Sequence, residues 1–185
     1  MKKRVVSLFL LVALSVGLIA GTAAPAQAAS AATKAKQKYK SYVTKKNGSF
    51  QYAKIIDIDG NGIPELLYND WSNTSTSGKT YVYTYNKSTK KMVKLKSMYF
   101  GKGYAPYYNK KKHMVVLTFF TTRDGKYAFY KVSGKKITKD STYYAKRGAT
   151  GAWKYTINGK KVSQSTYSKK LNAKMKGYNV AFRWL

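Results

Sequence analysis

The chain has 185 residues, and its 36 lysines and arginines against 6 aspartates and glutamates give it a formal net charge of +30. It contains no cysteine and a single histidine, which argues against a disulfide framework, a thiol redox centre or a zinc site. Tyrosine is abundant at 18 residues, and its ring can fill a core while its hydroxyl stays in contact with water.

Residues 1–28 have the pattern of a secretory signal peptide. Residues 2–4 are basic, the run 5–20 is almost wholly apolar, and Ala26-Gln27-Ala28 fits an A-x-A cleavage site. The apolar run is short for a membrane span, so an uncleaved anchor is the weaker alternative. We therefore expect a secreted mature chain, 29–185, that forms one domain with a net charge of +27 and no transmembrane span. This lysine-rich, cysteine-free composition is typical of a Gram-positive bacterium.

The first half of the mature chain predicts a helix and then two short strands. Residues 31–44 are rich in alanine and lysine and lack glycine and proline, and Asn47-Gly48 would end this helix. A strand is expected over 50–56 and another over 66–68. The acidic segment 57–65 between them is therefore predicted to be a loop that joins two strands.

From residue 80 onward the sequence predicts strands paired around polar turns. The clearest turn is Asn158-Gly159, because this pair favours the type I′ turn of a two-residue hairpin. A C-terminal helix is expected over 165–175, capped by Ser165 or Thr166 and ended by Gly177. The expected strands are 80–85, 91–98, 104–108, 114–120, 127–132, 135–138, 153–157 and 160–163.

These elements predict an α+β fold. It would consist mainly of antiparallel β-sheet built from hairpins, with a short N-terminal helix and a C-terminal helix. No internal repeat is strict enough for a solenoid or a propeller. The strand pattern leaves open whether the strands form one sheet or two.

The acidic segment carries the most specific chemistry in the chain, because three of the six acidic residues fall within nine positions. Its first, third, fifth and ninth side chains bear oxygen and its sixth residue is Gly62, a pattern suited to a loop around calcium. Carboxylates this close repel one another unless a cation lies between them. We therefore predict a structural Ca²⁺ site, for which magnesium would be less well suited. The predicted ligands are the side chains of Asp57, Asp59, Asn61 and Glu65 and the backbone carbonyl of Ile63.

An alternative for the same segment is a turn without an ion. Aspartate and asparagine side chains accept hydrogen bonds from backbone N–H groups a few residues ahead, and such bonds hold tight turns. In this case the acids would pair with neighbouring lysines such as Lys54.

The segment departs from the EF-hand pattern at its twelfth position, where Tyr68 stands in place of a bidentate acid. It instead resembles the calcium loop of integrin α-subunit blades and of FG-GAP and VCBS repeats, D-h-D-x-D/N-G-h-x-D, with Glu65 as the final acid. The stretch from Tyr52 to Tyr68 also resembles a segment of secreted Firmicutes proteins in which a strand runs into a D-x-D-G-x-G-x-P-E-L loop. This resemblance implies bound calcium, and because the loop occurs once it does not imply a propeller.

The charge of the chain predicts its partners. A net +27 on one small domain attracts polyanions over a long range, and the candidates are cell-wall teichoic acid, acidic glycans and anionic lipid surfaces. Nearly all of the charge is lysine, which favours diffuse, salt-sensitive binding, and no motif for sequence-specific nucleic-acid binding is present. An alternative is that the lysines only keep the protein soluble and its sheet edges unpaired.

We expect no enzymatic activity. His113 follows three lysines at a turn, no G-x-S-x-G motif is present, and Asp70, Asp124 and Asp140 lie at separate polar turns. The sequence thus predicts a secreted, non-enzymatic cationic domain with one structural calcium loop, associated with anionic polymers of the cell envelope. The alternative is an extracellular adhesion module for a protein or glycan partner, without a bound metal.

Overall fold

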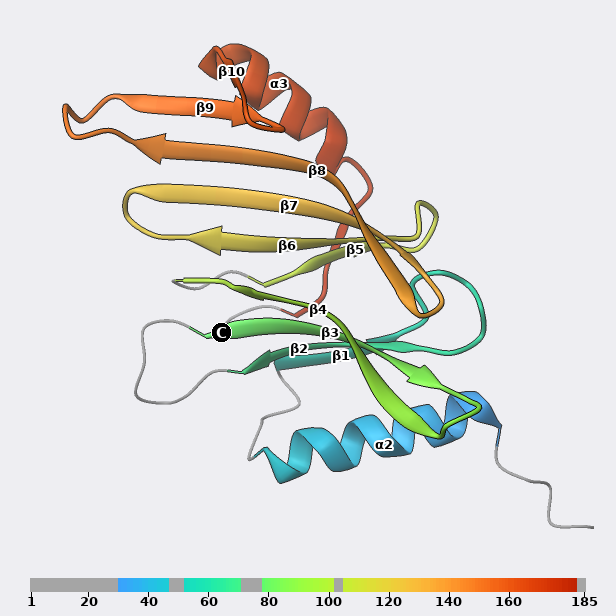
Figure 1. Ribbon diagram of the computed structural model, residues 1–185. Coiled ribbons are helices and arrows are strands. Elements are labelled where there is room, and N and C mark those ends of the chain that lie inside the picture. Colours follow the sequence, from blue (N-terminus) through green and yellow to red (C-terminus); the bar gives the residue numbers. More distant parts are fainter. Residues whose placement is uncertain (1–29, 47–51, 71–77, 102–104, 183–185) are drawn as a thin grey trace, which may run out of the picture.

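The computed structural model describes residues 30–46, 52–70, 78–101 and 105–182, which form two β-sheets and two helices (Figure 1). One helix lies near each end of the described chain, and all pairings between the named strands are antiparallel. This confirms the expected α+β fold built from hairpins. The predicted signal peptide, 1–28, lies outside the described residues. Within the described ranges, no helix is both long enough and apolar enough to cross a membrane.

The strands pair mostly with their neighbours in the chain. One sheet has four strands in the order β1-β2-β3-β4, and the other has seven in the order β10-β9-β8-β7-β6-β5-β11. The elements are α2 (Ala31–Lys45), β1 (Ala53–Ile56), β2 (Glu65–Asp70), β3 (Lys79–Asn86), β4 (Lys91–Tyr99), β5 (Tyr107–Asn109), β6 (Met114–Phe120), β7 (Asp124–Ser133), β8 (Lys136–Arg147), β9 (Trp153–Ile157), β10 (Lys160–Val162), α3 (Gln164–Met175) and β11 (Asn179–Val180).

The two sheets pack face to face, and the alternation of side chains along each strand decides which residues lie between them. In β2, Leu67 joins the core between the sheets, while its neighbours Leu66 and Tyr68 point to the opposite face. In β6, Val115 and Leu117 point into the same core. We call the face of each sheet that points toward the other sheet its inner face. The buried residues of this core are Ile58, Leu67, Val82, Ala105, Val115, Leu117, Ala128, Tyr130, Val132, Ala181 and Phe182.

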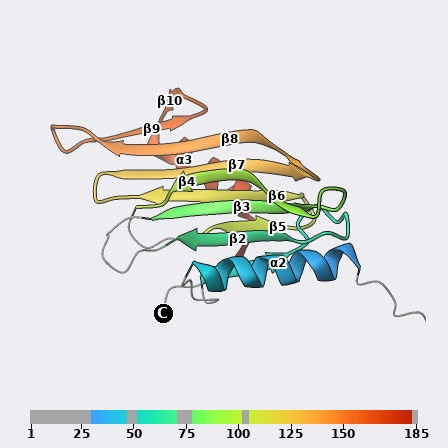
Figure 2. The ribbon, with the colours of Figure 1, turned by 60° about the horizontal axis from the view of Figure 1, so that its bottom comes forward.

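Each outer face is covered by one helix, which gives four layers in the order helix, sheet, sheet, helix (Figure 2). Helix α2 buries Ala35, Tyr39 and Val43, which recur every four residues and form one stripe against the four-stranded sheet. Helix α3 buries Tyr167 against the outer face of the seven-stranded sheet. Its N-cap is Ser163, whose hydroxyl accepts a hydrogen bond from the Thr166 N–H at 3.2 Å. The expected caps Ser165 and Thr166 are therefore wrong, because the helix begins at Gln164.

Two parts of the sheet differ from the sequence prediction. Strand β8 runs over twelve residues, Lys136–Arg147, where a short strand over 135–138 was expected. It pairs with β7 from Lys136 to Lys146 and with β9 from Tyr143 to Arg147. Backbone pairing therefore keeps this segment extended, although its mainly polar residues show no apolar alternation. Strand β11 was not predicted, since two exposed residues carry no periodic signal.

The two sheets are joined where β4 ends. The Phe120 N–H donates a hydrogen bond to the Phe100 carbonyl at 3.1 Å, and Gly101 forms a parallel bridge with Phe120. Gly101 has a φ of +62°, and a Cβ atom on it would collide with the Phe120 carbonyl oxygen. Glycine is therefore required here for two reasons: the positive φ angle and the close approach of the two backbone segments.

We predict that Gly101→Ala destabilises the protein by about 3 kcal/mol, because it combines left-handed backbone strain with a backbone collision. Gly159→Ala is the matched control, because Gly159 has a φ of +82° but open space around its Cβ position. It should cost only about 1–2 kcal/mol. Urea unfolding of both variants measures the difference. An equal loss of stability in the two variants would contradict the requirement for glycine where the Gly101 and Phe120 backbones meet.

Candidate metal centre

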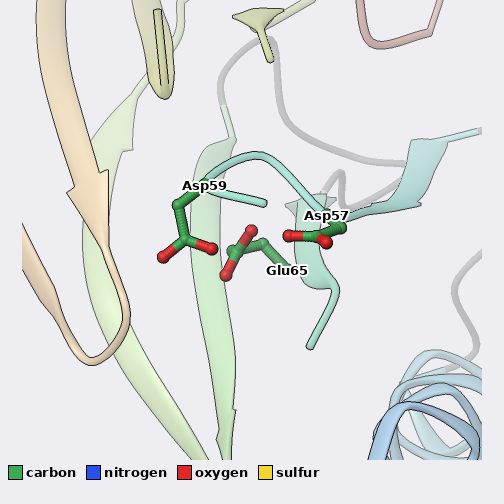
Figure 3. Close-up of side chains that lie close together, drawn as sticks. All are labelled: Asp57, Asp59 and Glu65. Carbon is green, nitrogen blue, oxygen red and sulfur yellow. The ribbon is translucent and has the colours of Figure 1, made fainter. Parts of the chain in front are cut away.

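The loop between β1 and β2 brings three carboxyl groups together at one end of the two-sheet core. Figure 3 shows Asp57, Asp59 and Glu65 grouped there, and one oxygen from each lies within 4.8 Å of the others. Oxygens on opposite sides of a calcium ion lie about 4.6–5.2 Å apart, since calcium–oxygen distances are about 2.3–2.6 Å. The cluster therefore has the size of a calcium site, and the three predicted acidic ligands meet.

Asp57 is held by backbone N–H groups of its own loop. Its two carboxylate oxygens accept hydrogen bonds from the Gly60 and Gly62 N–H groups, each at 2.9 Å. Both glycines have positive φ angles, +74° and +80°, which turn the loop back over Asp57. Each carboxylate oxygen retains a lone pair after one such bond, so the carboxylate can still accept a cation.

Asp59 connects the loop to the opposite sheet. Its Oδ1 accepts a hydrogen bond from the Asn61 N–H at 3.2 Å, and its Oδ2 accepts one from the Asn61 side-chain amide at 2.9 Å. The same Oδ2 also accepts a hydrogen bond from the Gly134 N–H. Gly134 lies in the turn between β7 and β8, so Asp59 ties the β1–β2 loop to a hairpin of the seven-stranded sheet.

The other two predicted ligands are placed differently. The Asn61 Oδ1 accepts a hydrogen bond from the Ile63 N–H at 2.7 Å, and its Nδ2 faces Asp59. Asn61 would therefore have to turn its side chain to offer its oxygen to an ion. Ile63 packs its side chain with the core under α2, and its carbonyl stays a predicted ligand.

Glu65 is the fully buried member of the cluster. It begins β2, and its Oε2 accepts a hydrogen bond from the Ile58 N–H at 2.9 Å. The Thr84 hydroxyl is a weaker donor to its Oε1, at 3.4 Å. The pKa of the Glu65 carboxyl is raised to about 8, mainly by burial. The hydrogen bond from the Ile58 N–H acts against this rise, and the nearby Asp59 and Asp57 charges add to it. The geometry thus places a carboxyl group where it ionises easily only beside a positive charge.

No lysine supplies that charge within the described ranges. There, the ion pair within 4.0 Å is Lys174 with Asp140, at 2.7 Å, and it lies between α3 and β8. The lysine pairing required by the ion-free alternative is therefore not found in the part of the chain that the structure describes. The side-chain-to-backbone hydrogen bonds of that alternative are present, and they would hold the loop with or without an ion.

Two neighbours of the loop come from distant turns that the sequence did not connect with it. Gly134 lies in the β7–β8 turn, and His113 closes the β5–β6 turn with a φ of +54° and places its ring beside Gly60. The sequence marks both segments as turns, but only the packing of the two sheets brings them to the loop. The remaining acids lie elsewhere, with Asp124 bonded to the Tyr144 hydroxyl at 2.6 Å.

The raised pKa of Glu65 predicts how stability depends on pH without a divalent ion. Below the ordinary value of 4.5, the carboxyl is protonated in the folded and the unfolded protein. As the pH rises from 4.5 to about 8, the unfolded state releases this proton first, so the free energy of unfolding falls. At pH 7 the loss is about 3 kcal/mol, since each pKa unit corresponds to about 1.4 kcal/mol.

Glu65→Gln should remove this loss, because the amide stays neutral and can still accept the Ile58 N–H. The free energy of unfolding, measured in the presence of a chelator between pH 5 and 8, tests this prediction. Asp70→Asn, at the other end of β2, is the control for the loss of a negative charge. If the free energy of unfolding changed with pH in the same way in the wild-type protein and in Glu65→Gln, the raised pKa of Glu65 would be contradicted.

Comparison of the chain with protein-family models, with curated proteins and with solved structures gave no match. The resemblance to the FG-GAP and VCBS loop therefore rests on the residues of the loop. The chemistry of this centre is accordingly inferred from its geometry.

Proposed function

We propose that this protein is a secreted cationic domain that holds one structural calcium ion and associates with anionic polymers of the cell envelope. The observation that carries the proposal is the convergence of Asp57, Asp59 and Glu65 without a lysine partner in the described ranges. In a chain with a net charge of +30, lysines are abundant, so the lack of a pairing at the densest acidic cluster favours another cation.

The ion would act by joining the two sheets. Asp59 is already bonded to the β7–β8 turn, and Glu65 reaches the cluster from the inner face of the four-stranded sheet. A cation between these groups would neutralise the mutual repulsion of the carboxylates and permit Glu65 to ionise. Because the chain has no cysteine, this link would take the place that a disulfide holds in many exported domains.

The proposed association with anionic envelope polymers rests on the positive charge of the protein. Exposed lysines lie on both outer helices, for example Lys36 and Lys40 on α2 and Lys169 and Lys170 on α3. The positive charge therefore covers opposite sides of the molecule, which suits contact with a flexible polymer that can reach more than one face.

We predict that calcium stabilises the chelator-treated protein. At a calcium concentration tenfold above the dissociation constant, the gain is about 1.4 kcal/mol, which corresponds to a rise in Tm of roughly 3–6 °C for a chain of this size. Millimolar calcium should suffice, since extracellular sites often have dissociation constants of about 10⁻⁴–10⁻³ M. Differential scanning calorimetry measures the shift, and magnesium should give a smaller one.

Two variants make this test specific. Asp59→Asn removes one ligand charge and should abolish both the shift and the heat of calcium binding. Asp70→Asn removes the same charge at the far end of β2 and should leave both unchanged. A wild-type protein that gives no binding heat at millimolar calcium would eliminate the ion from the proposal.

Association with anionic polymers should weaken steeply with salt. We expect binding to a teichoic-acid-bearing wall preparation to fall at least about tenfold between 50 and 200 mM salt, because the lysines displace counterions from the polymer. Co-sedimentation at increasing salt measures it. Binding that persists at high salt would instead indicate a specific protein partner and would count against the polymer.

A further inference from the structure

The two sheets differ in width, and part of the wider one has no sheet across from it. The seven-stranded sheet extends through β8, β9 and β10, whereas the four-stranded sheet ends at the edge strand β4. Figure 2 shows β8, β9 and β10 reaching beyond the smaller sheet. Helix α3 covers the outer face of this region, so its inner face is the side left open.

A groove of about 420 Å³ lies where β4 ends over this open face. Its floor is a row of cross-strand partners on the inner face: Phe119 faces Lys126, Lys126 faces Tyr144, and Tyr144 faces Thr156. The row crosses four strands, which corresponds to about 14 Å at the usual spacing between strands. Tyr99, at the end of β4, stands on the rim with 57% of its surface exposed, and the Lys79 ammonium lies 4.6 Å from the centre of its ring, over one of its faces. The groove is therefore elongated, and aromatic rings lie in its floor and on its rim.

The inner face changes its chemistry where the smaller sheet ends. Beneath that sheet it presents apolar residues such as Leu117 and Ala128. In the groove it presents the hydroxyl-bearing residues Thr142, Tyr144 and Thr156. A face with both hydroxyl groups and aromatic rings suits a ligand that has polar groups and an apolar side of its own.

The groove also carries positive charge. Lys126 lies in its floor, and Lys146 and Lys154 face each other one row farther along the same face. One acid, Asp124, faces Lys146 across the strands and accepts a hydrogen bond from the Tyr144 hydroxyl at 2.6 Å. Three lysines against one carboxylate leave an excess of positive charge, so the complementary ligand is an acidic one.

We propose that this groove binds a carboxylated glycan, an assignment that rests on the proposed association with anionic polymers and names its binding site. The aromatic rings of Tyr99, Tyr144 and Phe119 pack against the apolar faces of sugar rings, the threonine hydroxyls bond to sugar hydroxyls, and the lysines pair with carboxylates. A polyphosphate would use the lysines but leave the aromatic rings of the groove without a partner. A bilayer surface is too flat to enter a groove.

The test uses isothermal titration calorimetry with three probes at one moderate salt concentration. A hyaluronan hexasaccharide supplies sugar rings and carboxylates, cellohexaose supplies rings without charge, and a short linear polyphosphate supplies charge without rings. We expect the wild-type protein to bind the hyaluronan fragment most tightly.

Two groove variants and two matched controls locate the binding site. Lys126→Gln removes a groove charge and Tyr99→Ala removes the exposed rim ring. Lys169→Gln removes a lysine charge on α3, and Trp153→Ala removes a 44% exposed ring on the opposite face of the sheet. Each groove variant should weaken binding of the hyaluronan fragment about tenfold, as expected for loss of one charge-assisted or aromatic contact. Each control should change it less than about twofold. Neither Lys126 nor Tyr99 is buried, so both groove variants should fold.

The outcomes separate this inference from the proposed function. If Lys126→Gln and Lys169→Gln weaken binding of the hyaluronan fragment equally, binding is spread over the surface. The groove is then not the binding site, while the proposed association with anionic polymers stands. Equal affinity for polyphosphate with the same loss in the groove variants would overturn the glycan assignment. If the wild-type protein binds no polyanion even at low salt, the proposed association itself fails.

Discussion

The buried carboxyl of Glu65 and its hydrogen bond from the Ile58 N–H are the contact on which the rest of the candidate centre depends. This bond spans the loop from near its start to its end, so it closes the loop around the space in which the Asp57 and Asp59 oxygens meet. Ile58 itself is fully buried in the core between the sheets, which anchors the loop to the sandwich. A carboxyl in such a place is neutral near pH 7 unless a cation offsets the cost of burying its charge. The same contact thus shapes the loop and favours a cation beside the Glu65 carboxyl.

The four-layer packing explains how a chain with so few acids and so many lysines folds. Lysine side chains are kept at the surface, while the tyrosines fill much of the space beneath the helices. Under α2, Tyr39 donates its hydroxyl to the Pro64 carbonyl at 2.8 Å, which links the helix to the end of the acidic loop. Tyr42 and Tyr83 share a hydroxyl–hydroxyl hydrogen bond at 2.8 Å. These rings contribute apolar burial and directed polar contacts together, in a protein that has no disulfide to stabilise it.

The unequal width of the two sheets separates the two proposed sites. The acidic loop lies against the β5–β6 and β7–β8 turns, whereas the groove lies where β4 ends, near the chain segment that joins the sheets at Gly101. Near the acidic loop the two sheets contact each other through Asp59 and Gly134. At the groove the smaller sheet stops and exposes a polar part of the larger one. One sandwich can therefore combine a structural centre with a separate surface for a ligand.

Much of the secondary structure could be predicted from the sequence because it depends on local patterns. The helix near residue 31 follows from alanine and lysine content, the hairpins follow from alternation and turn residues, and Asn158-Gly159 forms the expected two-residue turn between β9 and β10. The nine-residue acidic pattern likewise predicted that Asp57, Asp59 and Glu65 would meet, since a short loop keeps its own residues close.

Other features depend on contacts between residues far apart in the chain. Alternation identifies which side chains share a face, but it cannot state what covers that face, so the number of sheets and their packing stayed open. The length of β8 follows from pairing with β7 and β9, and the approach of Gly134 to Asp59 joins residues 75 positions apart. The groove exists only because one sheet is wider than the other. The sequence by itself determined the helices, the hairpins and the acidic loop, because their interactions are local, whereas the burial of Glu65 and the open face beside β4 were decided by how the sheets pack.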